Sequence, residues 1–472
     1  MTMKSIYAGV FLSLLAGSAV QAADPDLVLS GEVTYAQYNT YVELPFAVPE
    51  GVSRLTVKFD YDGAGQRTTI DLGLADPHGM RGWSGGNKKS FTIAESDATP
   101  SYEPGRIDAG EWRLILGVPN IRQGVTSHYR AEISFDRAEE TVLKEGYAWY
   151  RGDLHMHTAH SDGFCLSRSG NKVNCPVFRT IEAAEAAGLD FIAISDHNAT
   201  TQNQDLRELQ PYFDKTLLIP GRELTTFHGH ANEWGTAADV DFRHGANGMA
   251  DHVHKLGGLF SLNHPNAPTG EACMGCGWDA PGFDPSRADS VEVVNGGGIR
   301  GAGDAALALP FWRGLLDKGL SPTAVGGSDN HDADLPTTTP GSVGFPATVV
   351  YAANLSQRAI LDGIKAGHVF VQIRGGDPAR RIELTSGKAM MGDHVKAPAG
   401  EVPVAIRVTG VEGGSIELLS DVPPQADPKP LSADERRGVM WKSDGKRHWL
   451  AVLVRDRDGQ AVLLSNPIYL AS

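Results

Sequence analysis

Two histidines, His155 and His157, stand two residues apart and flank Met156. In an extended strand, alternate side chains point to the same face, so both imidazoles would face one side together with Asp153. The turn that follows would bring Asp162 back toward them. Imidazole and carboxylate groups that converge at a strand end are typical ligands of a first-row divalent metal ion.

The same residue types recur further along the chain. Eleven of the sixteen histidines fall between His155 and His331. Further segments in this stretch join β-like apolar sequence to histidine, carboxylate or asparagine, at 191–198, 217–223, 228–232, 259–265, 290–295 and 323–331. Ligands of α/β sheets bind at the carboxyl ends of strands, so we expect these side chains to gather in one site.

Helices are expected between these strands. Pro176 can be the first residue of one helix, which contains 180–187 and ends at Gly188. A second is expected at 305–318, and Ser356 should cap a third that runs through Ile364. Alternation of strands and helices predicts an α/β fold with a parallel sheet.

A second His-x-His pattern, at His252 and His254, lies in a stretch that we also expect to be helical. Residues two apart on a helix do not share a face. We therefore interpret these two histidines as surface or packing residues.

Short motifs carry a family resemblance. They stand at residues 149–157, 161–163, 195–198, 221–223, 229–232, 263–265, 291–296 and 327–331. In these motifs and their order, the segment 147–375 resembles the PHP superfamily of metal-dependent hydrolases (polymerase and histidinol phosphatase). More closely, it resembles the CehA/McbA-type metallohydrolases. The resemblance implies a distorted (β/α)7 PHP barrel.

The resemblance also implies a metal site of nine residues in three groups. The first group is His155, His157, Glu223 and Asp329. In the second group, Glu223 bridges to an ion held by His230 and His264. The third group is Asp162, His197 and His331. The wider family has histidine where Asp162 stands here, so we expect one to three divalent ions, Zn, Mn or Fe.

Two further carboxylates and three arginines are candidates for the reaction itself. Asp196 and Glu292 are predicted to be catalytic, as proton-transfer groups, with loop-structuring or ligand-orienting roles as the alternative. Arg222, Arg300 and Arg374 lie near predicted strand ends and are predicted to bind an anionic part of the substrate. The alternative for each arginine is an ordinary surface position.

The flanking regions differ from the central one. A chain of 472 residues should hold about two to four domains. Residues 23–140 show short alternating runs between Gly- and Pro-rich turns, which predict a β-sandwich domain or a jelly roll. Residues 378–472 return to strands and predict a small C-terminal β domain, or strands that complete the N-terminal sandwich. The net charge of −15 argues against nucleic acid as a partner.

The N-terminus has the pattern of a signal peptide. Lys4 precedes an apolar stretch at 6–20, and Ala22 ends a small-residue cleavage pattern. We predict a signal peptide over 1–22 and a periplasmic or secreted protein without stable membrane insertion after cleavage. The alternative is an uncleaved membrane anchor.

The four cysteines are then expected to form disulfides. An even number of cysteines in an exported protein favours disulfide bonds. Pairing of the cysteines that are nearest in the sequence would join Cys165 to Cys175 and Cys273 to Cys276. Cross-pairing of the two loops stays open, as does a zinc or redox role for the Cys273 and Cys276 pair.

These patterns favour an exported, metal-dependent hydrolase of a small-molecule ester. The leading reaction is phosphoester hydrolysis, which is widespread in the superfamily. The alternative is hydrolysis of a carboxylic, carbamate or amide ester, and a second alternative is a non-catalytic, metal-dependent binding protein. The patterns indicate no oligomeric state.

We expect no free thiol in the mature protein, because export and the spacing of the cysteines both favour disulfides. Thiol titration under denaturing, non-reducing conditions should find essentially none. Four reactive thiols would contradict the expectation and would point to a reduced pair or a metal role.

Overall fold

The computed structural model describes residues 25–49, 52–94, 97–105, 107–135, 141–271, 273–375, 377–422 and 429–471. The predicted signal peptide at 1–22 lies outside the described residues. Within the described ranges, no helix is long and apolar enough to cross a membrane.

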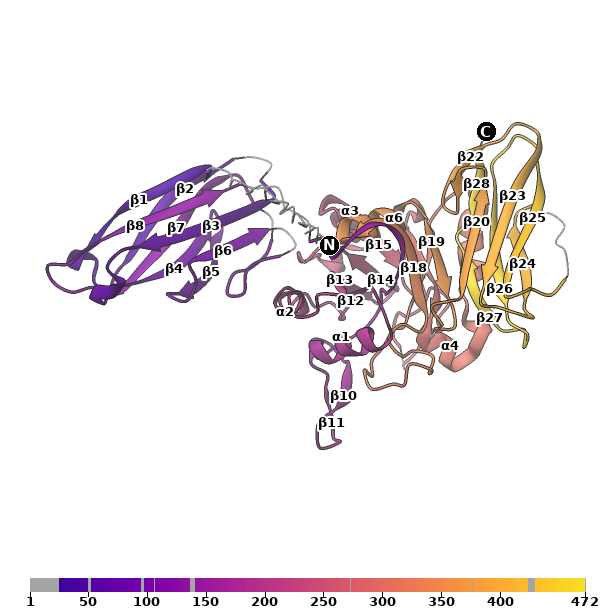
Figure 1. Ribbon diagram of the computed structural model, residues 1–472, viewed down its shortest axis with the longest axis horizontal. Helices are drawn as coiled ribbons and strands as arrows, with labels where there is room; N and C mark the ends of the chain where they lie inside the picture. Colours follow the sequence, from indigo (N-terminus) through magenta and orange to yellow (C-terminus); the bar gives the residue numbers. More distant parts are fainter. Residues whose placement is uncertain are drawn as a thin grey trace, which may run out of the picture.

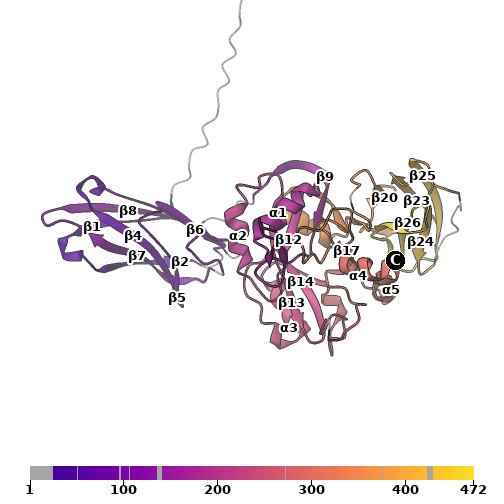
Figure 2. The same cartoon turned by 90° about the horizontal axis from the view of Figure 1, so that it is seen from below.

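The N-terminal part consists of two antiparallel sheets (Figures 1 and 2). Its strands are β1 (Leu27–Thr34), β2 (Tyr41–Val48), β3 (Arg54–Tyr61), β4 (Thr69–Asp76), β5 (Gly79–Gly85), β6 (Ser90–Ala94), β7 (Gly110–Asn120) and β8 (Thr126–Ser134). One sheet has the order β1-β8-β3-β6 and the other β2-β7-β4-β5. Alternate residues, among them Leu55, Leu74 and Trp112, pack into one shared hydrophobic core, as in a β-sandwich.

The central part is built on a mixed sheet. Its strands are β9 (Lys144–Asp153), β12 (Phe191–Ile194), β13 (Leu217–Thr226), β14 (Gly229–Trp234), β15 (Leu259–Leu262), β16 (Ser290–Asn295), β17 (Thr323–Gly327), β18 (Ala347–Leu355) and β19 (Val369–Gln372). They are hydrogen-bonded in the order β17-β16-β15-β14-β13-β12-β9-β18-β19. The small hairpin of β10 (Phe164–Leu166) and β11 (Lys172–Asn174) extends from the loop after β9 (Figure 1).

Six α-helices lie in the described residues of this part. They are α1 (Val177–Ala186), α2 (Gln202–Leu209), α3 (Ala246–Lys255), α4 (Gly296–Ala302), α5 (Leu309–Asp317) and α6 (Gln357–Lys365). Ser356 caps α6 as predicted, through its side chain and the N–H of Ala359. The helix predicted at 305–318 begins only at Leu309, because a 3-10 turn (Gly303–Ala306) precedes it.

The class is mixed α/β, but the structure does not show the repeating strand–helix units of a (β/α)7 barrel. Strands β13 and β14 pair antiparallel, and only residues 227 and 228 lie between them. A two-residue link closes an antiparallel hairpin, whereas a parallel connection needs a dozen residues or more. Strand β14 is also antiparallel to β15.

The C-terminal strands extend the central sheet. They are β20 (Arg381–Ser386), β21 (Ala389–Met390), β22 (His394–Lys396), β23 (Gly400–Thr409), β24 (Ser415–Ser420), β25 (Asp434–Ser443), β26 (His448–Arg455), β27 (Ala461–Ser465) and β28 (Ile468–Ala471). Strand β27 pairs with β19, followed by β26, β28 and β22, while β21-β20-β23-β25 form a separate sheet. Every described pairing of these strands is with β19 or among themselves, so they do not complete the N-terminal sandwich. The domain limits 23–140, 147–375 and 378–472 stay predictions.

The segments that follow strands β9 and β17 meet at the end of the sheet where the histidines lie. The N–H of Asp329 donates to the carbonyl of His155, and the N–H of His157 donates to that of Asn330, both at 2.8 Å. A Cβ atom at Gly327 would collide with Cβ of His155 and with a carboxylate oxygen of Glu292. Glycine is therefore required for this approach.

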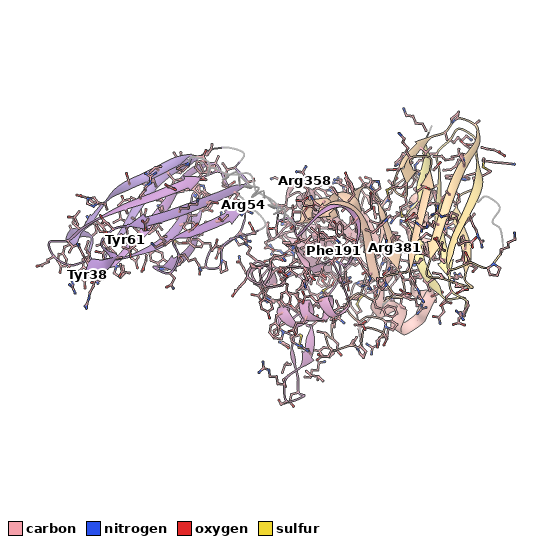
Figure 3. All side chains as sticks on the ribbon, in the orientation of Figure 1. Tyr38, Arg54, Tyr61, Phe191, Arg358 and Arg381 are labelled. Carbon is pink, nitrogen blue, oxygen red and sulfur yellow. A yellow bond between two sulfur atoms is a disulfide. The ribbon has the colours of Figure 1, made fainter. Side chains whose placement is uncertain are left out.

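A second glycine, Gly152, allows β9 to lie close to Phe191 of β12 in the same way. A Cβ atom at Gly152, at the end of β9, would collide with the ring of Phe191, which lies in the central part in Figure 3.

Replacing Gly327 with alanine should therefore separate the two strands. We expect the free energy of unfolding to fall by about 1–3 kcal/mol, the usual range for overpacking, together with weaker metal binding. Chemical denaturation and a metal titration measure the two effects. Gly314→Ala is the control, since a Cβ atom there meets nothing within 4 Å. Equal stability of the Gly327→Ala and wild-type proteins would contradict the prediction.

Candidate metal centre

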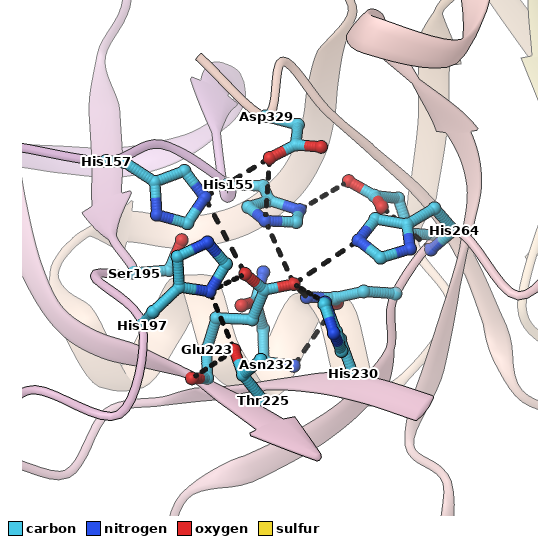
Figure 4. Close-up of polar contacts among 12 residues, drawn as sticks. His155, His157, Ser195, His197, Glu223, Thr225, His230, Asn232, His264 and Asp329 are labelled. Atoms are coloured by element: carbon cyan, nitrogen blue, oxygen red, sulfur yellow. Dashed lines mark hydrogen bonds and ion pairs between the residues drawn. The ribbon is translucent and has the colours of Figure 1, made fainter. Parts of the chain in front are cut away.

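The predicted ligands converge on one buried cluster (Figure 4). Four groups in the described residues place one ligand atom per side chain within 4.8 Å of one another: His157, Asp162, His197 and His331; His155, Glu223 and His264; His155, His157 and Asp329; and His230, His264 and Cys276. The ligands come from the ends of β9, β12, β15 and β17 and from within β13 and β14. The sheet therefore brings together all nine residues predicted from the sequence.

Glu223 is the centre of the cluster and is fully buried. Its Oε1 lies 3.4 Å from Nε2 of His155, 3.3 Å from Nδ1 of His230 and 3.3 Å from Nε2 of His264. The side-chain amide of Asn263 also donates to Oε1, at 2.9 Å. One carboxylate oxygen thus faces three imidazoles.

The second oxygen of Glu223 faces the other side of the cluster. Its Oε2 lies 2.8 Å from Nδ1 of His197 and 3.6 Å from Nε2 of His157. Burial alone would raise the pKa of Glu223, but the charge of His155 and hydrogen bonds from the surrounding histidines hold this pKa well below its ordinary value. Glu223 is therefore an anion that can bridge two positions.

Asp329 supplies a second carboxylate. Its Oδ1 lies 3.3 Å from Nε2 of His155 and 3.2 Å from Nε2 of His157. Asn295 donates to Oδ2 at 3.2 Å and orients the group. The backbone of Asp329 has φ of 53°, a left-handed conformation that is uncommon for non-glycine residues.

Asp162 forms the outer edge of the cluster. Its Oδ1 lies 3.3 Å from Nε2 of His331 and 3.8 Å from Nε2 of His197. Burial would raise the pKa of Asp162, but the hydrogen bond and charge of His331 lower it to about 2. The side chains of Asp162, His197 and His331 are 58%, 27% and 34% exposed, so this edge opens to solvent.

The donor set fits a divalent ion. Nε2 of His155 and Nδ1 of His230 are buried and lie 3.4 and 3.3 Å from Oε1 of Glu223. Neither atom makes a well-aligned hydrogen bond within the described part of the chain. A buried nitrogen without such a bond is costly, and coordination to a metal shared with the carboxylate would satisfy it.

Glu292 contacts the ligands from outside the cluster. Its Oε1 lies 2.9 Å from Nδ1 of His155, and its Oε2 accepts from the backbone N–H of His264 and from Asn295. A carboxylate behind a histidine fixes which ring nitrogen is free to bind metal. The structure thus gives Glu292 a positioning contact, and its catalytic role stays a prediction.

Asp196 is also buried, and both of its carboxylate oxygens accept hydrogen bonds from the protein. It accepts hydrogen bonds from the N–H and hydroxyl of Thr158 and from the hydroxyl of Ser161, at 2.6–2.7 Å. These contacts shape the turn before Asp162. The structure favours the loop-structuring alternative for Asp196, although its catalytic role remains untested.

The structure does not place Arg222 in the site. Its guanidinium is buried and pairs with Glu233, at 2.9 Å, and with Asp239. Because side chains alternate along β13, Glu223 faces the cluster and its neighbour Arg222 faces away. A substrate contact through Arg222 is therefore not supported.

In the described part of the chain, neither of the other two arginines pairs with a residue of the cluster. Arg374 pairs with Asp304 at 2.9 Å. Arg300 is an exposed residue of α4. Binding of an anionic part of the substrate by these arginines stays a prediction.

The structure joins Cys165 to Cys175 and Cys273 to Cys276, with Cα atoms 4.9 and 5.6 Å apart. This is the local pairing, and no described cysteine is free, so Cys276 has no thiolate to offer an ion beside His230 and His264. Cross-pairing of the two loops is not observed.

Several residues of the site were not singled out in the sequence. Asn263 and Asn295 orient Glu223 and Asp329, and the hydroxyl of Thr225 lies 2.7 Å from Nδ1 of His197. Both asparagines lie inside the quoted motifs, next to a ligand or at a strand end, which was the available signal. Thr225 lies two residues after Glu223 on the same face of β13.

Comparison with known proteins adds little. No protein-family model and no curated protein matches the chain. Among solved structures, it is similar to one from Bacteroides vulgatus ATCC 8482 described as a two-domain protein containing a predicted PHP-like metal-dependent phosphoesterase. The two share 19% identity over 71% of this chain and 99% of that chain, with a TM-score of 0.39. A TM-score this low does not establish a shared fold.

Metal uptake at neutral pH should release protons. Burial would lower the pKa of His264 and of His331, but hydrogen bonds and charges from Glu223 and Asp162 raise each to about 9. Since both values lie above that of a free imidazole, both rings are protonated at pH 7 in the metal-free protein, and an incoming ion must displace these protons. Metal affinity should therefore increase from pH 7 to about 9, on the order of tenfold per pH unit for each proton released.

Calorimetric titration in two buffers of different ionisation enthalpy counts the protons released on metal binding. Metal binding without proton release at pH 7 would show that these rings are neutral and would contradict the prediction.

The raised pKa values of His264 and His331 also stabilise the metal-free fold fully below about pH 6.5, and this stabilisation is lost as the pH rises through about 9.

Proposed function

We propose that this chain is an exported, metal-dependent hydrolase of the PHP type that acts on a small-molecule phosphoester. The observation that supports this most is that the two oxygens of Glu223 face different histidines. Oε1 faces His155, His230 and His264, and Oε2 faces His157 and His197. A carboxylate that bridges two ions holds them close together, and ions about 3.5–4 Å apart can stabilise both the attacking and the leaving oxygen of a phosphoester.

Divalent ions bound there would lower the pKa of a bound water toward neutrality and polarise the ester bond. Imidazole and carboxylate donors suit Zn, Mn or Fe. Asp162, His197 and His331 keep their side chains partly exposed, so a substrate can reach this edge. A structural metal site would be closed by protein ligands, which argues against a non-catalytic binding protein.

A second candidate is hydrolysis of a carboxylic, carbamate or amide ester, as the CehA/McbA resemblance implies. One observation favours it: Arg222 and Arg374 pair with carboxylates of the protein and do not offer their charge to a phosphate. A neutral ester needs no such contact, and one ion is sufficient for it.

Export is supported by the sequence pattern at the N-terminus and by the two disulfides, which persist in oxidising compartments. We place the mature protein in the periplasm or outside the cell. The net charge of −15 fits a small-molecule substrate better than a nucleic acid.

Asp162→Ala and His331→Ala test the phosphoesterase proposal. Both remove ligands of the exposed group, where a phosphoryl group would be held. Each should lower kcat/KM on phosphoesters by at least ~100-fold, since electrostatic stabilisation of the transition state is lost. Steady-state assays on phosphate esters and carboxylic esters in parallel provide the measurement.

His228→Ala is the matched control, because this histidine lies on the same hairpin as His230 but pairs with Asp279 at the surface. Near-normal turnover of phosphoesters by both site variants would contradict a multi-ion phosphoesterase. Cleavage of carboxylic or carbamate esters alone by the wild-type protein would establish the second candidate instead.

A further inference from the structure

The loop that contains Cys273 and Cys276 contacts two of the metal-site histidines through its backbone. Nε2 of His230 lies 3.2 Å from the carbonyl oxygen of Met274. Nδ1 of His264 lies 3.1 Å from the carbonyl oxygen of Cys276. A carbonyl oxygen only accepts hydrogen bonds, so in each pair the ring nitrogen is the donor.

These two contacts determine which nitrogen of each ring is available. When Nε2 of His230 carries the hydrogen, Nδ1 of the neutral ring has a lone pair, and this atom lies 3.3 Å from Oε1 of Glu223. The reverse holds for His264, whose Nε2 lies 3.3 Å from the same oxygen. The loop thus turns the free lone pairs of both rings toward one point beside Glu223.

The position of the loop does not depend on packing of its central side chain. Met274 is 73% exposed. The loop is instead closed by the disulfide between Cys273 and Cys276, and Gly275 brings its backbone against the β13–β14 hairpin. Gly275 has φ of 74°, and a Cβ atom there would collide with the carbonyl oxygen of Thr226.

We infer that the disulfide-closed loop 273–276 is a backbone clamp that holds His230 and His264 in their metal-binding orientation. The inference rests on the proposed metal-dependent function and assigns the clamp to the ion bound by these two histidines and Glu223. The group of His157, Asp162, His197 and His331 contains neither histidine, so an ion bound there does not depend on the clamp. Loss of a group that orients a metal-ligating histidine usually weakens metal binding by about 10–100-fold.

The test is a Zn²⁺ titration against a competing chelator, with the full-length mature protein. The double variant Cys273→Ser/Cys276→Ser should bind one ion per chain about 10–100-fold more weakly than the wild type, while an ion bound by His157, Asp162, His197 and His331 is held as before. Wild-type protein treated with a phosphine reductant, which adds no thiolate, should show the same selective loss. Gly275→Ala keeps both cysteines but pushes the loop away from Thr226, and we expect the same direction of change.

Cys165→Ser/Cys175→Ser is the matched control, because it removes a disulfide whose cysteines belong to no ligand group. The thermal unfolding temperatures of both double variants and the wild type show whether a loss of Zn²⁺ affinity is local or follows from a general loss of stability. Equal Zn²⁺ affinity of the Cys273→Ser/Cys276→Ser variant and the wild type would overturn the clamp. An equal loss in both double variants would overturn it too, since that result reports stability alone.

Co²⁺ provides a second readout. A thiolate-to-cobalt absorption band in the reduced wild type would overturn the clamp, because the loop would then act through sulfur as a ligand; absence of that band, with the selective loss, supports it. A wild-type protein that binds no divalent ion would overturn both the clamp and the metal-dependent function. Normal metal binding without ester hydrolysis would overturn the function alone.

Discussion

A single buried carboxylate imposes the main constraint on this structure. Glu223 is fully buried, and nitrogens of five histidines lie within 3.6 Å of it: His155, His157, His197, His230 and His264. A buried charge is tolerated only when it is paired and hydrogen-bonded. Without an ion, protonated histidines supply the balancing charge, and with an ion the metal supplies it. The same arrangement that makes Glu223 a suitable bridging ligand therefore makes the metal-free site a strong proton acceptor.

The surrounding fold holds each ligand from behind. Glu292 lies against His155, Asn295 against Asp329, and Thr225 against His197, while loop carbonyls accept from His230 and His264. Such contacts fix ring orientation and keep the lone pairs pointing inward. Gly327 also helps to position the ligands. It lets the end of β17 lie against His155, so that Asp329 stands beside the histidines that follow β9.

The nine ligands were implied by the family resemblance, while alternation along an extended strand placed His155 and His157 on one face and the strand-end pattern predicted that the groups would gather in one site. The same reasoning separated the helical pair: His252 and His254 lie on α3, and His254 pairs with Asp289. Other features of the site could not be predicted from the residue types. Alternation also turns Arg222 away from the site, but the sequence does not show its buried partner Glu233. The antiparallel β13–β14 hairpin was missed because 228–232 was assigned to a further strand of a parallel set. The loop carbonyls have no side-chain signal at all.

The most direct test of the central role of Glu223 is the metal content of the purified protein and of its Glu223→Gln variant, by elemental analysis. Circular dichroism would verify that the variant is folded. The replacement keeps the size of the side chain and removes its negative charge. The account predicts at least one divalent ion per wild-type chain and loss of most of that metal in the variant. Wild-type metal content in a folded Glu223→Gln protein would contradict it.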